Sequence, residues 1–111
     1  MPTVHGTVNS RGQAFNFREI QYGGGGHGGG QRGIYVGLNG GGTAEFSISP
    51  NPHDNPAYNR HQDEFYQTVA QAIADNYTDP NGANNNWDQA GGTAVFRGET
   101  YNLTYEGMFH G

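Results

Sequence analysis

The five histidines are the residues best suited to bind a metal ion or to move a proton. They are His5, His27, His53, His61 and His110. No two of them have the spacing that places a pair of ligands on one turn of a helix, and the zinc-binding pattern H-E-x-x-H is absent. The chain also has no cysteine to supply a thiolate. We therefore expect no metal site and no cofactor, while a histidine cluster assembled from distant loops is compatible with the spacing.

A second set of residues has the types needed for acid and base catalysis. Glu45, Arg97 and His110 follow the order of general base, phosphate-neutralising arginine and general acid, which resembles that of small secreted ribonucleases. Those enzymes place a helix before the sheet, whereas this chain predicts four strands before its helix, and its net charge of −5 repels RNA. These residues define the alternative function, a small secreted toxin or hydrolase.

Aromatic residues beside amide and carboxylate groups predict a contact surface. The asparagine-rich loop 81–92 has Trp87 as its only large apolar residue. Asn86 and Asp88 flank that tryptophan, and Tyr35 lies opposite the apolar face of its predicted strand. Because flat rings beside hydrogen-bonding groups suit sugar rings and adaptable protein interfaces, we predict that these four residues contact a partner. The alternative is that Trp87 folds back as the plug of its own loop.

The glycine-rich segment 23–30 contains His27 and is followed closely by Arg32. Glycine loses more backbone freedom on ordering than any other residue, so this run predicts a loop. The run includes the spacing G-x-G-x-x-G, but the dinucleotide-binding fingerprint needs a strand before it and a helix after it, and here a strand follows. Consecutive backbone N–H groups beside an arginine can instead form an anion-binding nest. His27 and Arg32 therefore join the predicted contact residues.

Composition limits the class of protein and its partners. A chain of 111 residues is the size of one domain, and a net charge of −5 argues against a nucleic-acid binder held by a basic face. No stretch approaches the roughly 18 apolar residues of a membrane span, and the first residues lack the features of a signal peptide. All five basic residues are arginine. Lysine-free, cysteine-free chains are typical of proteins outside a cytosol, so we expect an extracellular, surface or virion location.

Alternation of apolar and polar residues predicts three β-hairpins. The first joins strands 3–8 and 14–20 through a turn at 9–12. The second joins strands 34–38 and 44–48 through a turn at 39–42, and the third joins strands 94–96 and 101–105 through a turn at 97–100. Residues 41–46 recur as residues 91–96 with five of six positions matching. We interpret this repeat as two strands that leave similar glycine turns with alanine and phenylalanine on one face.

One amphipathic helix is predicted over residues 57–77. The proline-rich connector 49–56 precedes it and supplies Asn55 as the N-cap with Pro56 in the first turn. Apolar residues at spacings of three and four form one stripe, which consists of Tyr58, His61, Phe65, Val69, Ala72, Ile73 and Asn76. Because His61 lies on that stripe, we expect it in the core.

Together these elements predict a single α+β domain over residues 1–111. The order is β-β-β-β-α-β-β, with an antiparallel sheet of about six short strands and the helix packed on one face. No compact nucleophile-and-base motif occurs, so we expect no catalysis. We expect a non-enzymatic binding or self-assembly module, a homo-oligomer if it assembles, that contacts a protein partner, a glycan or other copies through aromatic and amide-rich loops.

Overall fold

The computed structural model of the protein describes residues 3–22, 31–79, 81 and 86–109. Its main elements are β1 (His5–Ser10), β2 (Gln13–Gln21), β3 (Arg32–Leu38), β4 (Thr43–Ser49), α1 (Pro56–Arg60), α2 (Gln62–Tyr77), β5 (Gly92–Phe96) and β6 (Glu99–Phe109), with short 3-10 helices η2 (Pro52–Asp54) and η3 (Trp87–Gln89). The predicted fold class and order of strands are confirmed. The predicted loop 23–30 lies outside the described residues.

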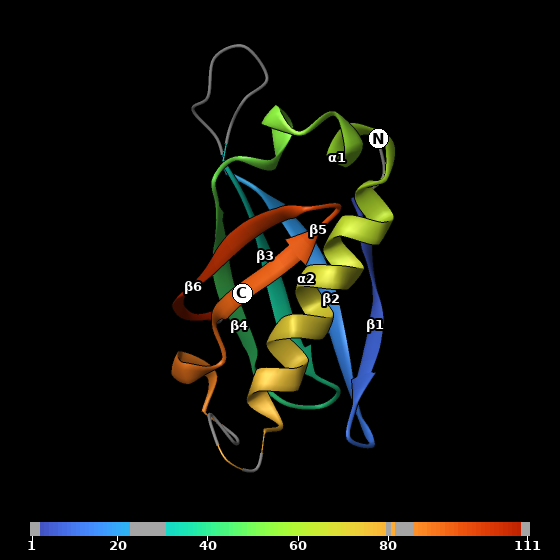
Figure 1. The fold of residues 1–111 in the computed structure, drawn as a ribbon. Helices are drawn as coiled ribbons and strands as arrows, with labels where there is room; N and C mark the ends of the chain where they lie inside the picture. Colours follow the sequence, from blue (N-terminus) through green and yellow to red (C-terminus); the bar gives the residue numbers. More distant parts are fainter. Residues whose placement is uncertain (1–2, 23–30, 80, 82–85, 110–111) are drawn as a thin grey trace.

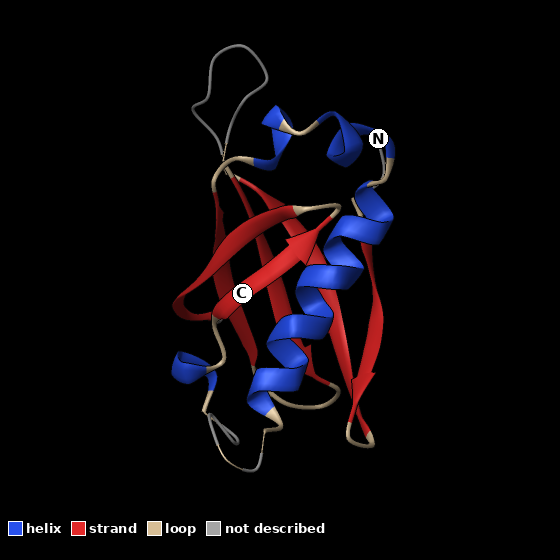
Figure 2. Ribbon diagram, in the orientation of Figure 1, coloured by secondary structure: helices blue, strands red, loops and turns tan. Residues whose placement is uncertain are grey.

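The six strands form one antiparallel sheet in the order β1-β2-β3-β4-β6-β5. Strands β1 to β4 form a meander, and β6 then pairs with β4, so β5 becomes the second edge. The sheet curls, and α2 lies on its concave side between the edge strands β1 and β5 (Figure 1). Figure 2 shows the strands wrapping behind this helix. The helix therefore covers the inner face of the sheet and leaves the outer face uncovered.

Two tight turns set the ends of the sheet. In Arg11-Gly12, between β1 and β2, φ is 48° and 84°, and in Arg97-Gly98, between β5 and β6, φ is 47° and 87°. Positive φ at both central residues defines a type I′ turn, whose twist matches that of the strands it joins. Each turn fixes the register of its hairpin.

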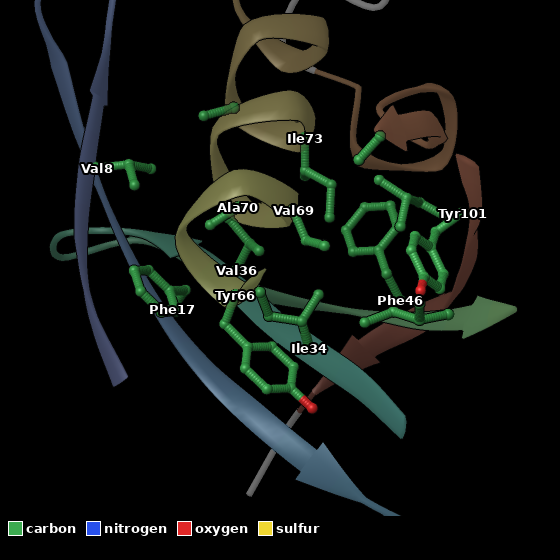
Figure 3. Packing of buried hydrophobic residues seen from close by; sticks show 14 of the residues in the cluster. Val8, Phe17, Ile34, Val36, Phe46, Tyr66, Val69, Ala70, Ile73 and Tyr101 are labelled. Carbon is green, nitrogen blue, oxygen red and sulfur yellow. The ribbon is translucent and has the colours of Figure 1, made fainter. Parts of the chain in front are cut away.

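The core is rich in aromatic rings. Inner side chains of the sheet such as Phe17, Ile34 and Val36 meet Val69 and Ile73 of α2 (Figure 3). Phe65 is fully buried, and its ring meets those of Tyr58, Phe96 and Tyr101 edge-on, with centroids 4.9, 5.2 and 5.1 Å apart. Edge-to-face pairs add to the energy of burial. The repeated segments behave alike, since the buried residues of the two copies are Ala44, Phe46, Ala94 and Phe96.

The prediction of one continuous helix is wrong at His61. That residue has φ −135° and ψ 49°, outside the helical region, and separates α1 from α2. Asn55 caps α1 as predicted, because its side-chain oxygen accepts a hydrogen bond of 2.9 Å from the N–H of Ala57. Phe65, Val69 and Ile73 of the predicted stripe stay buried, but the break takes His61 off that stripe. His61 is therefore exposed rather than in the core, and the residues buried beyond the predicted stripe include Tyr66, Ala70 and Ala74.

Phe65→Ala should lower the free energy of unfolding by about 3–5 kcal/mol, because it empties a fully buried site between rings. Urea denaturation followed by circular dichroism measures the change. Gln67→Ala, on the exposed side of the same helix, is the matched control and should change stability by no more than about 0.5 kcal/mol. Equal stability of the two variants would contradict this packing.

Candidate binding site

The outer face of β3, a central strand, carries a single side chain. Its outward positions are Gly33, Tyr35 and Gly37, which alternate with buried residues that face the core. A Cβ atom on Gly33 would lie 2.6 Å from the carbonyl oxygen of Phe46, and one on Gly37 would lie 2.8 Å from that of Gly42. Both positions therefore require glycine. Tyr35 is therefore the one side chain that β3 itself contributes to the outer face, and neighbouring side chains approach the strand at the two glycines.

Side chains of the neighbouring strands pack around Tyr35. The guanidinium carbon of Arg18, on β2, lies 5.2 Å from the centroid of its ring, in a cation–π contact. The ring of Phe109, on β6, lies 4.6 Å away at an angle of 47° and is 40% exposed. Beside these rings is a hollow of about 210 Å³, lined by Asn16, Phe17, Arg18, Tyr35, Thr43 and Phe109.

A β-bulge in β6 turns Phe109 toward the outer face. The register of β6 against β4 shifts at Glu106, which has no partner of its own in β4. Gly107 follows with φ 132°, a conformation that favours glycine. Before the bulge, odd-numbered residues such as Tyr105 pack toward the core; after it, Met108 packs on the core and Phe109 faces outward.

A second hollow on the outer face, of about 220 Å³, is lined by Tyr22, Gln31, Glu45, Ser47 and Glu106. The hydroxyl of Tyr22 donates to Glu45 Oε2 at 2.5 Å, and that of Ser47 donates to Glu106 Oε2 at 2.6 Å. The ring of Tyr22 lies over Gly33, where a Cβ atom would be 2.8 Å from it. The glycine in β3 thus makes room for this tyrosine.

The surroundings of Tyr22 indicate a negative potential in the second hollow. Burial raises the pKa of the Tyr22 hydroxyl, and the hydrogen bond to Glu45 and the charges of Glu45 and Glu106 raise it further. The first hollow has Arg18 as its charged residue. We define the outer-face site as the two hollows together, with Arg18, Tyr22, Tyr35, Glu45, Glu106 and Phe109 as its main residues.

The structure places Trp87 against its own domain. Its ring stacks on that of Tyr77, with centroids 4.0 Å apart at 28°, and meets the rings of Phe15 and Phe46 at 6.1 and 6.4 Å. This geometry matches the alternative in which Trp87 plugs its own loop. Contact of Trp87 with a partner stays a prediction, and it would compete with this packing.

Arg32 belongs to a buried polar cluster at one end of the core. Its side chain is 8% exposed, and its guanidinium contacts the ring nitrogen of His53. Tyr58 and Tyr66 share a hydrogen bond of 2.8 Å between their hydroxyls, and burial raises the pKa of both. Glu19, 5% exposed, accepts a backbone N–H at 2.9 Å through one of its oxygens. The side chain expected beside an exposed glycine-rich loop is therefore turned into the core.

The other predicted contact residues lie apart from the outer-face site or outside the description. Asn86 and Asp88 are exposed on either side of Trp87. His27 lies outside the described residues. Of the six predicted contact residues, only Tyr35 lies on the outer-face site within the part of the chain that the structure describes.

Of the residues of the alternative, catalytic function, Glu45 and Arg97 lie in the described part of the chain, and these two do not come together. Glu45 lies opposite Gly107 in the pairing of β4 with β6. Arg97 lies in the turn before β6, which at about 3.4 Å per strand residue places it roughly 25–30 Å from Glu45. It forms an ion pair of 2.8 Å with Glu64 of α2. His110 lies outside the described residues, so Glu45 and Arg97 are the two that can be compared.

Among the residues that the structure describes, no group of three or more histidine, aspartate or glutamate side chains could hold a metal ion. No helix there is long and apolar enough to cross a membrane. Comparisons of the chain with family models, with curated proteins and with solved structures find no match. Function must therefore be argued from the chemistry of the site.

The sequence did not predict Arg18, Glu106 or Phe109 as site residues. The sequence did contain a signal for Arg18. Gly33 and Gly37 on either side of Tyr35 leave its ring accessible to a side chain on the neighbouring strand, which is where Arg18 lies. Phe109 had no such signal, since simple alternation along β6 would place it inside.

Glu45→Gln should lower the pKa of Tyr22 toward its ordinary value of about 10, because the substitution removes a negative charge and weakens a charge-assisted hydrogen bond. The carbon-13 shift of the tyrosine ring carbon that bears the hydroxyl, followed from about pH 8 to about pH 11, reports this titration. Glu99→Gln, an exposed acid at the far end of β6, should leave it unchanged. A Tyr22 signal that titrates normally in the wild type would contradict the geometry.

Trp87→Ala should destabilise the protein by up to about 3 kcal/mol, at the low end of the range for buried rings because the indole is only half-buried. Thermal unfolding measures the loss. The exposed neighbour Asp88 provides the control, and Asp88→Ala should leave the melting temperature almost unchanged. An unchanged melting temperature for Trp87→Ala would mean that the indole does not plug the domain.

Proposed function

We propose that this protein is a non-enzymatic binding module that works outside the cytosol and holds a glycan on the outer face of its sheet. The observation that carries the proposal is the hollow beside Tyr35 and Phe109, bordered by hydrogen-bonding side chains. Its volume of about 210 Å³ is below the roughly 300–1,000 Å³ of pockets for drug-sized ligands, so it suits one sugar ring at a time.

The chemistry around the hollow complements a pyranose. Such a ring presents C–H groups on its faces and hydroxyls around its edge, and an aromatic side chain packs against the C–H groups. Arg18 and Asn16 can donate hydrogen bonds to the hydroxyls, and the carboxylate of Glu45, which lies opposite Tyr35 in the sheet, can accept them. Together with Tyr35 and Phe109, these groups come from four adjacent strands, β2, β3, β4 and β6, which fix their backbone positions.

Two further features support a binding role outside a cytosol. Both hollows are open to solvent, whereas catalysis benefits from a site that excludes water. The chain has neither lysine nor cysteine, a composition that we associate with exported and surface proteins. A protein partner or a second copy would use the same rings, and the glycan experiment separates these cases.

Phe109→Ala should lower glycan affinity at least about tenfold, because it removes one ring beside the hollow. The wild-type protein is first labelled with a dye at its N-terminal amine, because a lysine-free chain has no side-chain amine to label. The labelled protein is then screened on a glycan array. Titration calorimetry with the best glycan then compares the variants. Val95→Ala, at an exposed apolar residue on the edge strand β5 and outside the lining of the hollow, should bind like the wild type.

Asn16→Ala provides a second variant at an exposed position that should fold normally. It should also weaken binding. Absence of wild-type binding on the array would exclude the glycan, and binding that is unchanged in both variants would place the glycan elsewhere on the protein. Either result overturns the proposal.

A further inference from the structure

Strand β5 is a free edge of the sheet. It pairs with β6 alone in the described part of the chain. The type I′ turn makes Phe96 and Glu99 a hydrogen-bonded pair, and because such pairs recur at every second residue, Ala94 also directs its N–H and C=O toward β6. Thr93 and Val95 therefore direct their N–H and C=O groups away from the sheet.

Nothing in β5 protects this edge. Natural edge strands are usually protected by lysine, proline, inward-pointing charges or bulges. The five residues of β5, GTAVF, include no charge and no proline, and their pairing with β6 is regular. Val95 is 59% exposed. Among the described residues the other exposed large hydrophobic residue is Phe109, which is less exposed. Such an edge is a template for another strand.

At the opposite edge α2 contacts the backbone of the strand itself, whereas near β5 the side chain of Asn76 on α2 donates to the carbonyl oxygens of Ala90 and Gly91, which precede the strand. The side-chain amide of Gln71 donates 2.8 Å to the carbonyl oxygen of Asn9 on β1. The hydroxyl of Ser10 donates 2.7 Å to Asp75. Strand β1 is thus tied to the helix, and β5 is the edge that offers its backbone groups.

A groove of about 780 Å³ runs beside β5. The outward side of α2 forms its floor, and β1 and β5 lie on either side, as Figure 1 shows for the three elements. Its charged residues are two carboxylates, Glu64 and Asp75, and no arginine lines it. Glu64 is paired with Arg97, but both side chains are about half exposed, so this pair is weak and can be shared.

We propose that this groove binds an extended, positively charged segment of a partner protein, which adds to the sheet as a further strand beside β5. A groove between a sheet edge and a helix is a setting in which peptides bind by strand addition, with main-chain hydrogen bonds for affinity and alternate side chains for specificity. Here the main-chain partners are Thr93 and Val95. This surface is separate from the outer-face site, so the two proposals stand independently.

The dimensions and charges agree with one short strand. Glu64 and Asp75 are about 16 Å apart along the helix axis, the length of about five strand residues, and β5 has five. In an added strand, alternate side chains point toward α2, where arginine or lysine meets the two carboxylates. The remaining side chains lie beside Val95 and favour β-branched residues.

A second copy of this chain fits the groove less well. Its own β5 carries no positive charge, and pairing through β5 would bring two acidic α2 surfaces toward each other. The net charge of −5 adds to that repulsion. The charge of the groove therefore selects a basic partner over self-association.

The test uses a fluorescent ten-residue peptide of alternating arginine and valine, with both ends blocked, and fluorescence anisotropy with the intact protein. We expect saturable binding that weakens with salt. Val95→Pro removes one outward N–H and should lower affinity at least about tenfold, whereas Val95→Thr keeps that N–H and should bind like the wild type. Glu64→Gln should weaken binding about two- to fivefold, and Glu99→Gln, an acid outside the groove, should not.

Two peptide controls need no variant of the protein. The same peptide with alternate backbone nitrogens methylated keeps its charge but cannot form the strand, so it should not bind. A peptide with glutamate in place of arginine should not bind either.

Equal binding of the methylated peptide would show attraction by charge alone, and absence of binding by the parent peptide would exclude a basic strand. A mass of two chains by light scattering that Val95→Pro reduces to one would assign the edge to a second copy. Each of these results overturns the proposal.

Discussion

The contacts of Phe65 hold together the three parts of the chain that could otherwise pack separately. Its ring joins α2 to Tyr58 of α1 and to Phe96 and Tyr101 of the last hairpin. With 32% hydrophobic residues, the chain has few side chains with which to fill the inside of a curled sheet, and large rings fill it most efficiently. Because α2 takes the space between β1 and β5, the sheet cannot close into a barrel. Two edges and one groove follow directly from that packing.

The sheet also separates two groups of polar side chains with different consequences. Arg32 and Glu19 lie buried on the inner side, where Arg32 contacts His53 of η2 and Glu19 accepts the N–H of Val4, so these contacts help to specify how the segment before α1 sits on the sheet. Glu45 and Glu106 lie on the outer side and bond to hydroxyls at the surface. Changes there alter the chemistry of the surface at little cost in stability.

Periodicity and turn chemistry were sufficient to predict the fold. The signals that predicted it are local: the alternation in β3 and β4, the glycine turns and the Asn55 cap. Each of them predicted an element that the tertiary structure contains. The break at His61 was not visible, because the spacing of three and four residues runs through that position without interruption. The inward turn of Arg32 was equally hidden, since its partner His53 is distant in sequence and charged residues are rarely buried. The outward position of Tyr35 was predicted because the alternation of residues within β3 alone determines which side chains face outward.

The bulge at Glu106 and Gly107 accommodates one extra residue in β6 and so decides which of the later side chains face outward. In a strand, the face of every residue after an insertion depends on whether the count before it is odd or even. A deletion of Glu106 or Gly107 would restore uninterrupted alternation and leave Met108 inside and Phe109 outside, whereas loss of the bulge without a deletion would send Phe109 into the interior and bring Met108 out. Two homologous chains that differed only by that deletion would share a fold, a core and the outward aromatic ring. An ungapped alignment through β6 would then equate residues from opposite faces.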